Sequence, residues 1–288
     1  MKIKKPFVGI FAFIIVLLTM PLGHALMIVM EKTLGHDYLF PAAIGLGFLG
    51  LILLILGMLS KKQVNSTLLG LFSGLFVWTG WVEFSLVYYA GRMEVLPIFD
   101  IAGEIATKPE YRVMQGSIGF WTIIMIYYFF GTKTGCNLFT WLQKRVKVVN
   151  LKEIKPSTRN VTVTTFMEIN MMLWTFYLLL LFIYDEKLIG DESLVTHFVA
   201  YGSLLLSLYL FWKLLQKPNM GYAIRYAIPT VTIFWNFVEI LGRWDVFKEI
   251  WVHPFDYATE MIACTVIIIL LIIIIFLEKR KKKKNKSI

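Results

Sequence analysis

Long apolar runs separated by short polar segments fill most of the chain. Eight runs approach the length of about 20 residues that a helix needs to cross a hydrocarbon core. They lie at residues 7–30, 39–59, 67–90, 117–131, 164–184, 194–215, 222–242 and 258–277. The fourth run is the shortest, and we expect its helix to begin a few residues earlier, near Met114. The pattern predicts an all-α integral membrane protein with eight transmembrane helices.

The first run has a second interpretation. It follows the basic residues Lys2, Lys4 and Lys5, and the small-residue stretch Gly23-His24-Ala25 would suit cleavage of a signal peptide. Its length fits a membrane span better than the apolar core of a signal peptide, so we expect it to be retained.

Composition supports the membrane class. Hydrophobic residues make up 58% of the chain and charged residues 17%, and the mean hydropathy is +0.68. A soluble domain has about 25% charged residues. The net charge of +10 comes from Lys and Arg gathered beside the apolar runs, as membrane orientation requires. It therefore indicates a lipid bilayer as the partner and no nucleic acid.

The distribution of basic residues predicts the orientation. With the N-terminus inside, most Lys and Arg fall on the cytoplasmic side, including the segment 132–163 and the tail 278–288. This asymmetry follows the positive-inside rule. We therefore expect a cell (inner) membrane protein with both termini in the cytoplasm. Most Asp and Glu fall on the outer side, where they would raise the local concentration of cations.

Several short motifs recur at a nearly constant separation. Glu186-Lys187 follows Glu31-Lys32 by 155 residues (186 − 31), and Glu239 follows Glu83 by 156 (239 − 83). Phe255-Asp256 likewise repeats Phe99-Asp100, whereas the Gly-Arg pair returns after 151 residues (243 − 92).

We interpret these matches as two parallel four-helix repeats. The predicted organisation is a first repeat at 1–131, a basic cytoplasmic linker at 132–163, a second repeat at 164–277 and a basic cytoplasmic tail at 278–288. Because four is even, both repeats enter the membrane in the same sense and would be related by an axis along the membrane normal. A duplication kept for packing alone is the alternative.

Glu83 and Glu239 are the strongest candidates for function. Each lies inside an apolar run, and an ionisable residue at membrane depth is costly and marks a functional site by default. Both would lie in the outer third of the membrane and could line one cavity, where they would carry a proton or bind a cation. In the alternative, each glutamate is satisfied by its neighbours and only fixes helix packing.

Further candidates surround this pair. His24 would lie at a depth where it could join the glutamates, and Trp81 and Trp235 could form the wall of a substrate cavity. Arg92 and Arg243 each follow a glycine near the membrane surface and could bind an acid or a lipid phosphate. Hydrogen-bonded packing for the histidine and an interfacial aromatic belt for the tryptophans are the alternatives.

The outer segment adds acids but no clear metal site. Asp100 and Glu104 share one face if helical, yet the sequence shows no metal-ligand spacing of Cys or His and identifies no cofactor. Cys136 is expected near the inner face and Cys264 in the outer half of a span, so we do not expect them to pair, and two cysteines cannot make a disulfide framework.

Three functions remain open on this sequence. The preferred one is a small secondary transporter or permease for a proton, a cation or a small polar, cationic solute, with a site that contains Glu83 and Glu239. The second is a membrane-embedded enzyme that acts on a lipid or quinone-like substrate near the outer leaflet, with the same glutamates in acid-base roles. The third is a non-catalytic membrane assembly subunit.

Overall fold

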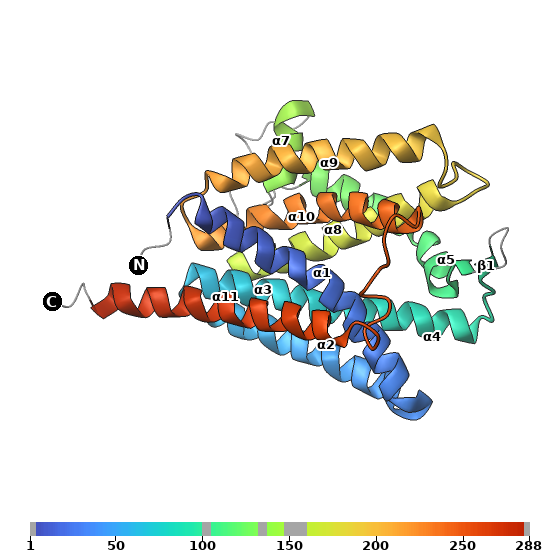
Figure 1. Ribbon diagram of the computed structural model, residues 1–288, viewed down its shortest axis with the longest axis horizontal. Helices are drawn as coiled ribbons and strands as arrows, with labels where there is room; N and C mark the ends of the chain where they lie inside the picture. The colour runs from blue at the N-terminus through green and yellow to red at the C-terminus, as the bar shows by residue number, and fades with distance from the viewer. Residues whose placement is uncertain (1–3, 100–104, 132–136, 147–159, 285–288) are drawn as a thin grey trace. The chain divides into compact units, whose positions relative to one another are not determined.

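Helices form most of the described chain (Figure 1). The computed structural model describes residues 4–99, 105–131, 137–146 and 160–284. Its elements are α1 (Phe7–Thr33), α2 (Gly35–Leu59), α3 (Gln63–Val77), the π-helical turn η1 (Trp78–Glu83), α4 (Phe84–Arg92), the strands β1 (Ile98–Phe99) and β2 (Ile105–Thr107), α5 (Pro109–Gln115), α6 (Ile118–Ile126), the π-helical turn η2 (Tyr127–Gly131), α7 (Asn137–Val146), α8 (Val161–Tyr184), α9 (Leu194–Leu215), α10 (Met220–Arg243) and α11 (Ala258–Lys284).

The long apolar helices identify a multi-pass membrane protein. In the described chain, six helices have the length and apolar composition of a span, and a seventh span results if α5 and the helix after it, bent by 45°, are one crossing. Helices suit lipid because they satisfy every backbone hydrogen bond internally. Helix α10 has 24 residues, enough to cross, but carries Arg225, Asn236 and Glu239 along its length.

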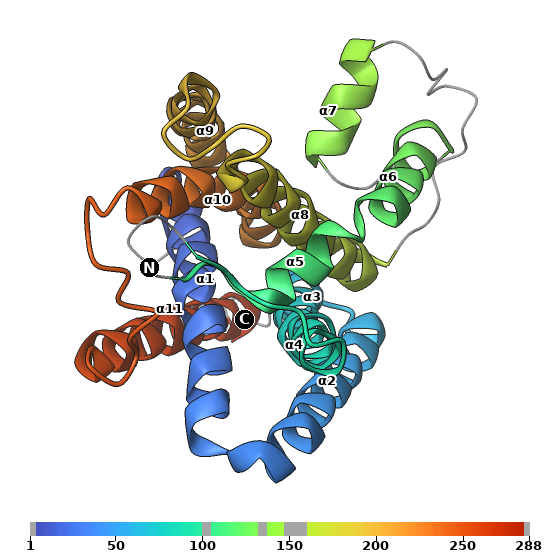
Figure 2. The same cartoon turned by 90° about the vertical axis from the view of Figure 1, so that its right-hand side faces the viewer.

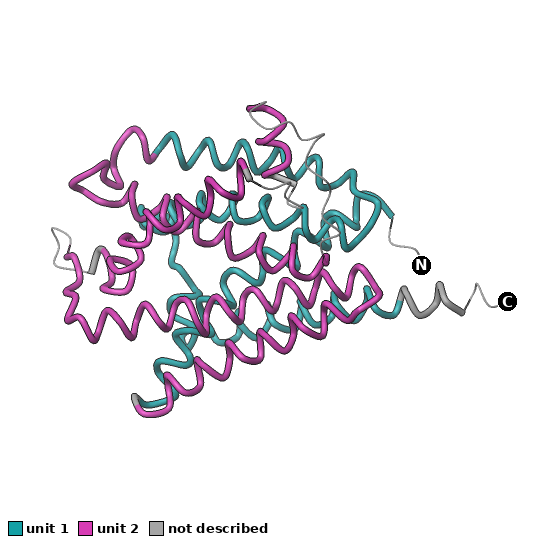
Figure 3. The backbone as a smooth tube through the Cα atoms, turned by 180° about the vertical axis from the view of Figure 1, so that it is seen from behind, with its two compact units in different colours: residues 1–35, 197–288 teal, residues 36–196 magenta. Residues whose placement is uncertain are grey.

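The chain divides into two compact units, coloured separately in Figure 3. Unit 1 comprises residues 1–35 and 197–288, and unit 2 comprises residues 36–196. The units cut across the two halves expected from the sequence. Unit 1 contains α1 from the first half, together with α10 and α11 from the second. Unit 2 contains α8 from the second half, together with α2 to α6 from the first.

A close helix pair, α3 with α8, forms the centre of unit 2. Gly70 faces Thr162 so closely that a Cβ added at Gly70 would lie 2.6 Å from the Thr162 carbonyl oxygen. One turn along, Gly74 packs against Ile169, and Trp78 then meets Trp174. The order of these contacts means that α3 and α8 run in the same direction. Small residues four apart allow such close approach in membrane helices.

Helix α1 forms the centre of unit 1 and packs against α10 and α11, as the end-on view in Figure 2 shows. Its Ala12 and Val16 are fully buried, and so are Ala223 and Ala227 of α10. In Figure 1, α1 and α10 run in one direction, whereas α9 and α11 run back. The same arrangement therefore occurs in both units. In unit 1, α1 of the first half packs against α10, the third helix of the second half. In unit 2, α8 of the second half packs against α3, which begins the third helix of the first half.

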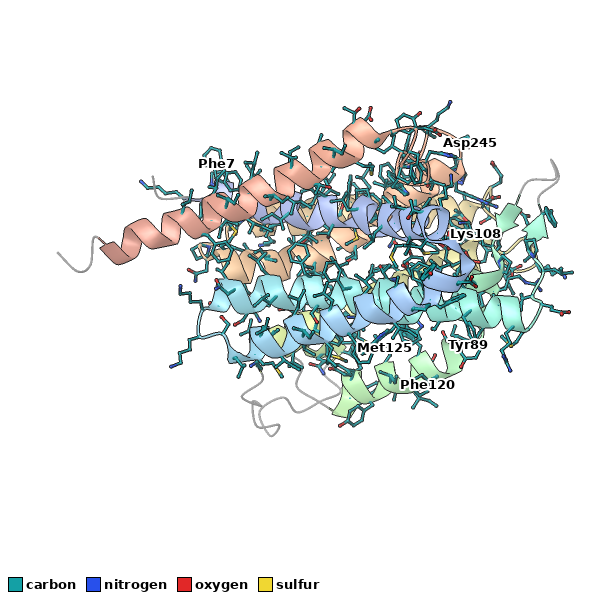
Figure 4. All side chains as sticks on the ribbon, turned by 90° about the horizontal axis from the view of Figure 1, so that it is seen from below. Phe7, Tyr89, Lys108, Phe120, Met125 and Asp245 are labelled. Carbon is teal, nitrogen blue, oxygen red and sulfur yellow. The ribbon has the colours of Figure 1, made fainter. Side chains whose placement is uncertain are left out.

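Helices α2, α6 and α9 expose apolar side chains over much of their surface. Phe120 of α6 points away from its neighbours (Figure 4), and Phe198 of α9 is 81% exposed. Apolar surface of this extent is expected in contact with lipid. The expected linker 132–163 contains α7, and the rest of it up to residue 159 lies outside the described residues. In the tail, α11 continues to Lys284.

Candidate functional site

Glu83 lies at the end of the π-helical turn η1, inside the continuous helix that runs from α3 to α4. Its side chain is buried, at 8% exposure. The Nε1 of Trp78 donates a hydrogen bond to Glu83 Oε1 at 2.9 Å. The hydroxyl of Tyr177, on α8, donates to the same oxygen at 3.3 Å. Two neutral donors from two helices therefore hold this carboxylate.

The π-helical turn explains the spacing of the Trp78–Glu83 pair. In η1 the Phe84 N–H bonds to the Thr79 carbonyl, a step of five residues in place of the usual four. Because one π-helical turn contains an extra residue, Trp78 lies five residues before Glu83 and is still only one turn away. Such insertions are rare and are frequent at functional sites.

Aromatic rings surround the Glu83 carboxylate on the α8 side. Trp78 meets Trp174 edge-on with ring centroids 6.1 Å apart, and lies 5.6 Å from Tyr177. Tyr111 of α5 extends this cluster, because its ring centroid lies 6.0 Å from that of Tyr177. The negative faces of aromatic rings attract cations. The carboxylate and the rings together form an environment that attracts cations.

Glu239 has a similar arrangement in unit 1. The Nε1 of Trp235 donates to Glu239 Oε1 at 2.6 Å, and the two residues lie four apart on the regular helix α10. Trp235 packs against Trp251 with ring centroids 4.8 Å apart. Each unit thus presents a glutamate bonded by an indole N–H from the preceding turn of its own helix. The two glutamates belong to different units.

The connection after α10 brings another acid to this end of the helix. The carboxylate of Glu249 packs over Gly242, where an added Cβ would collide with it. Burial, and next the like charge of Asp245, raise the pKa of Glu249, while His253 and Arg243 act in the opposite sense. Glu249 also interacts electrostatically with Glu239. The end of α10 therefore concentrates acidic groups beside the Trp235–Glu239 pair.

The two Gly-Arg motifs end their helices in the same way. Glu94 and Asp245, two residues after Arg92 and Arg243, adopt left-handed φ angles of 52° and 53°. At the first end, the Val95 N–H bonds to the Ala90 carbonyl and the Glu94 N–H to the Gly91 carbonyl. The same two bonds recur after α10, from Val246 to Leu241 and from Asp245 to Gly242. Both ends are Schellman caps, normally closed by glycine.

The Glu31-Lys32 and Glu186-Lys187 motifs do not share local structure. Glu31 lies within α1, whereas Glu186 lies in the turn after α8 ends at Tyr184. Asp100 and Glu104 lie outside the described residues.

The structure places Trp81 against α2 and His24 in unit 1. Trp81 Nε1 donates to the Ile44 carbonyl at 3.2 Å, and its ring meets Phe48 edge-on. Trp81 thus packs on α2, and Trp78 is the tryptophan that bonds Glu83. His24 lies partly buried on α1 in unit 1, the unit that contains Glu239. Arg92 is exposed and Arg243 is half-buried.

Glu168 is a buried carboxylate that the sequence interpretation left out. It lies in the first half of α8 at 4% exposure. It is followed two residues later by Asn170, whose amide approaches Gly74 across the α3–α8 contact. The rule that selects Glu83 and Glu239, an acid inside an apolar run, also selects Glu168.

No set of three His, Cys, Asp or Glu side chains in the described ranges is arranged to hold a metal ion. The hydrogen bonds described at Glu83 and Glu239 join carboxylates to indoles and a phenol. No family model, curated protein or solved structure matches the chain.

Proposed function

We propose that the protein is a small permease in which Glu83 and Glu239 carry a proton, a cation or a small cationic solute across the membrane. One observation carries this proposal. In each unit, a membrane helix presents a glutamate whose carboxylate accepts an indole N–H from the turn before it, at 2.9 Å and 2.6 Å.

The donors at these carboxylates explain why a cation or proton fits. Trp78, Tyr177 and Trp235 orient the carboxylates by hydrogen bonds but do not neutralise them. A charge inside the hydrocarbon core costs several kcal/mol, so a bound proton or cation stabilises the site. The rings of Trp78 and Trp235 add attraction for a cation.

The proposed topology has eight spans with both termini in the cytoplasm. Helices α9 and α11 run in the same direction within unit 1, so a chain that crosses in both must also cross back through α10. The polar residues of α10 are then intramembrane groups. Cysteines placed singly at Lys62 and Lys217 of a cysteine-free variant should react with an impermeant maleimide only after the cells are opened. Cysteines at Arg92 and Lys248 should react in intact cells. If the cysteine at Lys248 reacted only after the cells were opened, α10 would not cross the membrane.

We further propose that the two halves are diverged repeats that exchange their first helices. The Schellman caps at Glu94 and Asp245 and the two Trp–Glu pairs support this interpretation. So does the packing of α1 with α10 and of α8 with α3, which pairs a first helix with the third helix of the other half in both units. The proposal expects residues 1–131 to superpose on 164–277, with an axis along the membrane normal.

Flux through reconstituted protein tests the function. Purified protein is placed in liposomes that contain a pH-sensitive dye, and a potassium gradient with valinomycin supplies a membrane potential. Parallel vesicles measure uptake of labelled sodium and of a small organic ammonium ion. We expect flux of at least one of these, and we expect Glu83→Gln and Glu239→Gln to abolish it.

The matched control is Glu192→Gln, which makes the same chemical change at an exposed residue outside the helices. This variant should retain full flux. Wild-type flux no greater than that of empty liposomes for all three probes would contradict the permease. Full flux in both buried Gln variants would contradict the assignment of the glutamates.

A further inference from the structure

A cluster of basic and aromatic side chains lies where α9 ends and α10 begins, in unit 1. Four aromatic rings and two lysines interleave there. Lys213 lies over the rings of Trp212 and Tyr209, at 4.5 Å and 5.6 Å from their centroids. Lys217 lies 4.4 Å from the Tyr226 centroid and 5.4 Å from that of Tyr222.

Two more cations join this basic-aromatic cluster. The Arg225 guanidinium lies 5.7 Å from the Tyr222 centroid, and its buried Nε has no hydrogen-bond partner in the described chain. Lys5, at the start of α1, acts electrostatically on Lys217. The start of α1 also contacts this region directly, because a Cβ added at Gly9 would lie 2.7 Å from the Leu214 carbonyl oxygen.

Within the described residues, no carboxylate is paired with the cations of this cluster. Residues 1–30 and 193–238 contain no Asp or Glu, and no ion pair to Lys213, Lys217 or Arg225 occurs in the parts of the chain that the structure describes. Burial lowers the pKa of Lys217, and the like charges of Lys213 and Lys5 lower it further. Mutual repulsion of this kind is relieved when an anion binds.

We propose that this basic-aromatic cluster binds the phosphate of an anionic phospholipid headgroup. Lys and Arg recognise phosphate by charge and hydrogen bonds, and basic pockets between membrane helices bind such headgroups. The exposed rings identify lipid as the source of the phosphate. Tyr209 and Trp212 are 51% and 55% exposed at the end of a span, where amphipathic rings meet headgroups and acyl chains. The proposal does not depend on the proposed ion pathway.

The corresponding connection in the other half provides a matched control. Lys61 and Lys62 lie between α2 and α3, as Lys217 lies between α9 and α10. Both are exposed, and the sequence from Leu49 to Leu71 contains no aromatic residue. Removing these two charges changes the net charge as much as removing Lys213 and Lys217, without touching the cluster.

Lipid binding to the purified full chain tests the proposal. Native mass spectrometry in detergent measures bound phosphatidylglycerol and bound phosphatidylcholine with the same acyl chains. We expect tight binding of phosphatidylglycerol alone. Lys213→Gln/Lys217→Gln should weaken it on the order of tenfold or more, since each basic residue near an anionic surface contributes substantially. Lys61→Gln/Lys62→Gln should change it little, and Lys213→Arg/Lys217→Arg should retain it.

Three results would overturn the proposal. Equal binding of the two lipids would show that charge is not recognised. Equal losses in the cluster variant and in the control variant would show nonspecific attraction. Displacement of phosphatidylglycerol by millimolar inorganic phosphate would assign the cluster to a soluble phosphate and not to a lipid. The arginine variant keeps the test valid if the glutamine variant does not fold, because loss of binding in folded arginine-substituted protein also contradicts a charge-based site.

Discussion

Replacing Gly70 by alanine tests the contact that supports the Glu83 site. The new Cβ would lie 2.6 Å from the Thr162 carbonyl oxygen and 3.0 Å from the Thr165 Cβ. Carbon to oxygen contacts between helices normally measure about 3.3 Å or more. Helix α8 must therefore move away from α3 by about 0.7 Å, and a gap of this size forfeits roughly a quarter to a half of the local dispersion energy.

The expected cost of Gly70→Ala is about 1–3 kcal/mol, the usual range for overpacking. For a chain of this size, 1 kcal/mol shifts the unfolding midpoint by roughly 2–4 °C, so we expect a loss of about 2–12 °C. The same movement stretches the Tyr177–Glu83 hydrogen bond, which is already 3.3 Å long, so flux should also fall.

Thermal unfolding of the purified protein, followed by tryptophan fluorescence in detergent, measures the effect. Gly202→Ala on α9 is the control, because an added Cβ there meets no atom within 4 Å. It should leave the midpoint unchanged or raise it slightly, since alanine is the better helix former. Equal unfolding temperatures for Gly70→Ala and Gly202→Ala would show that the close α3–α8 contact does not stabilise the protein.

Three further predictions concern single side chains, and each is read from the same unfolding assay. Trp78→Phe removes the donor to Glu83 and should cost about 1.5–3 kcal/mol if the carboxylate is ionised. Trp121→Phe, whose indole N–H has no hydrogen-bond partner among the described residues, should cost much less, and equal losses would contradict the role of the bond. Glu249→Gln should stabilise the protein increasingly as the pH rises above the ordinary value of 4.5, because a raised pKa means that ionisation costs stability; a constant difference from pH 4 to pH 9 would count against this. Glu94→Gly should raise the midpoint by about 2–8 °C, because a left-handed residue other than glycine costs roughly 1–2 kcal/mol, and a lower midpoint would refute the strain.

The hydrophobic pattern predicts the helices better than it predicts their partners. Apolar runs at spanning length correspond to α1, α2, α8, α9 and α11, because the bilayer dictates length and composition directly. The partners depend on where small residues allow close approach. Gly70 and Gly74 allow the close approach of α8 to α3. A hydropathy pattern does not identify such glycines.

The candidate site was predictable in part for a related reason. Glu83 and Glu239 are conspicuous because charge is rare in apolar runs, and Glu168 is found by the same rule applied once more. The residue that contacts Glu83 was not predictable from regular helix spacing. Helix periodicity selects residues three or four positions away, whereas the π-helical turn brings Trp78, five positions away, to the carboxylate.

Infrared difference spectroscopy of the reconstituted protein measures whether Glu83 and Glu239 take up protons or bind a cation. Spectra recorded across a pH change, and with and without a bound cation, detect gain or loss of protonated carboxyl groups. We expect a carboxyl signal that responds to one of these changes and that is weakened by Glu83→Gln and by Glu239→Gln, while Glu192→Gln retains it in full. A response identical in the wild type and in both buried variants would contradict this expectation.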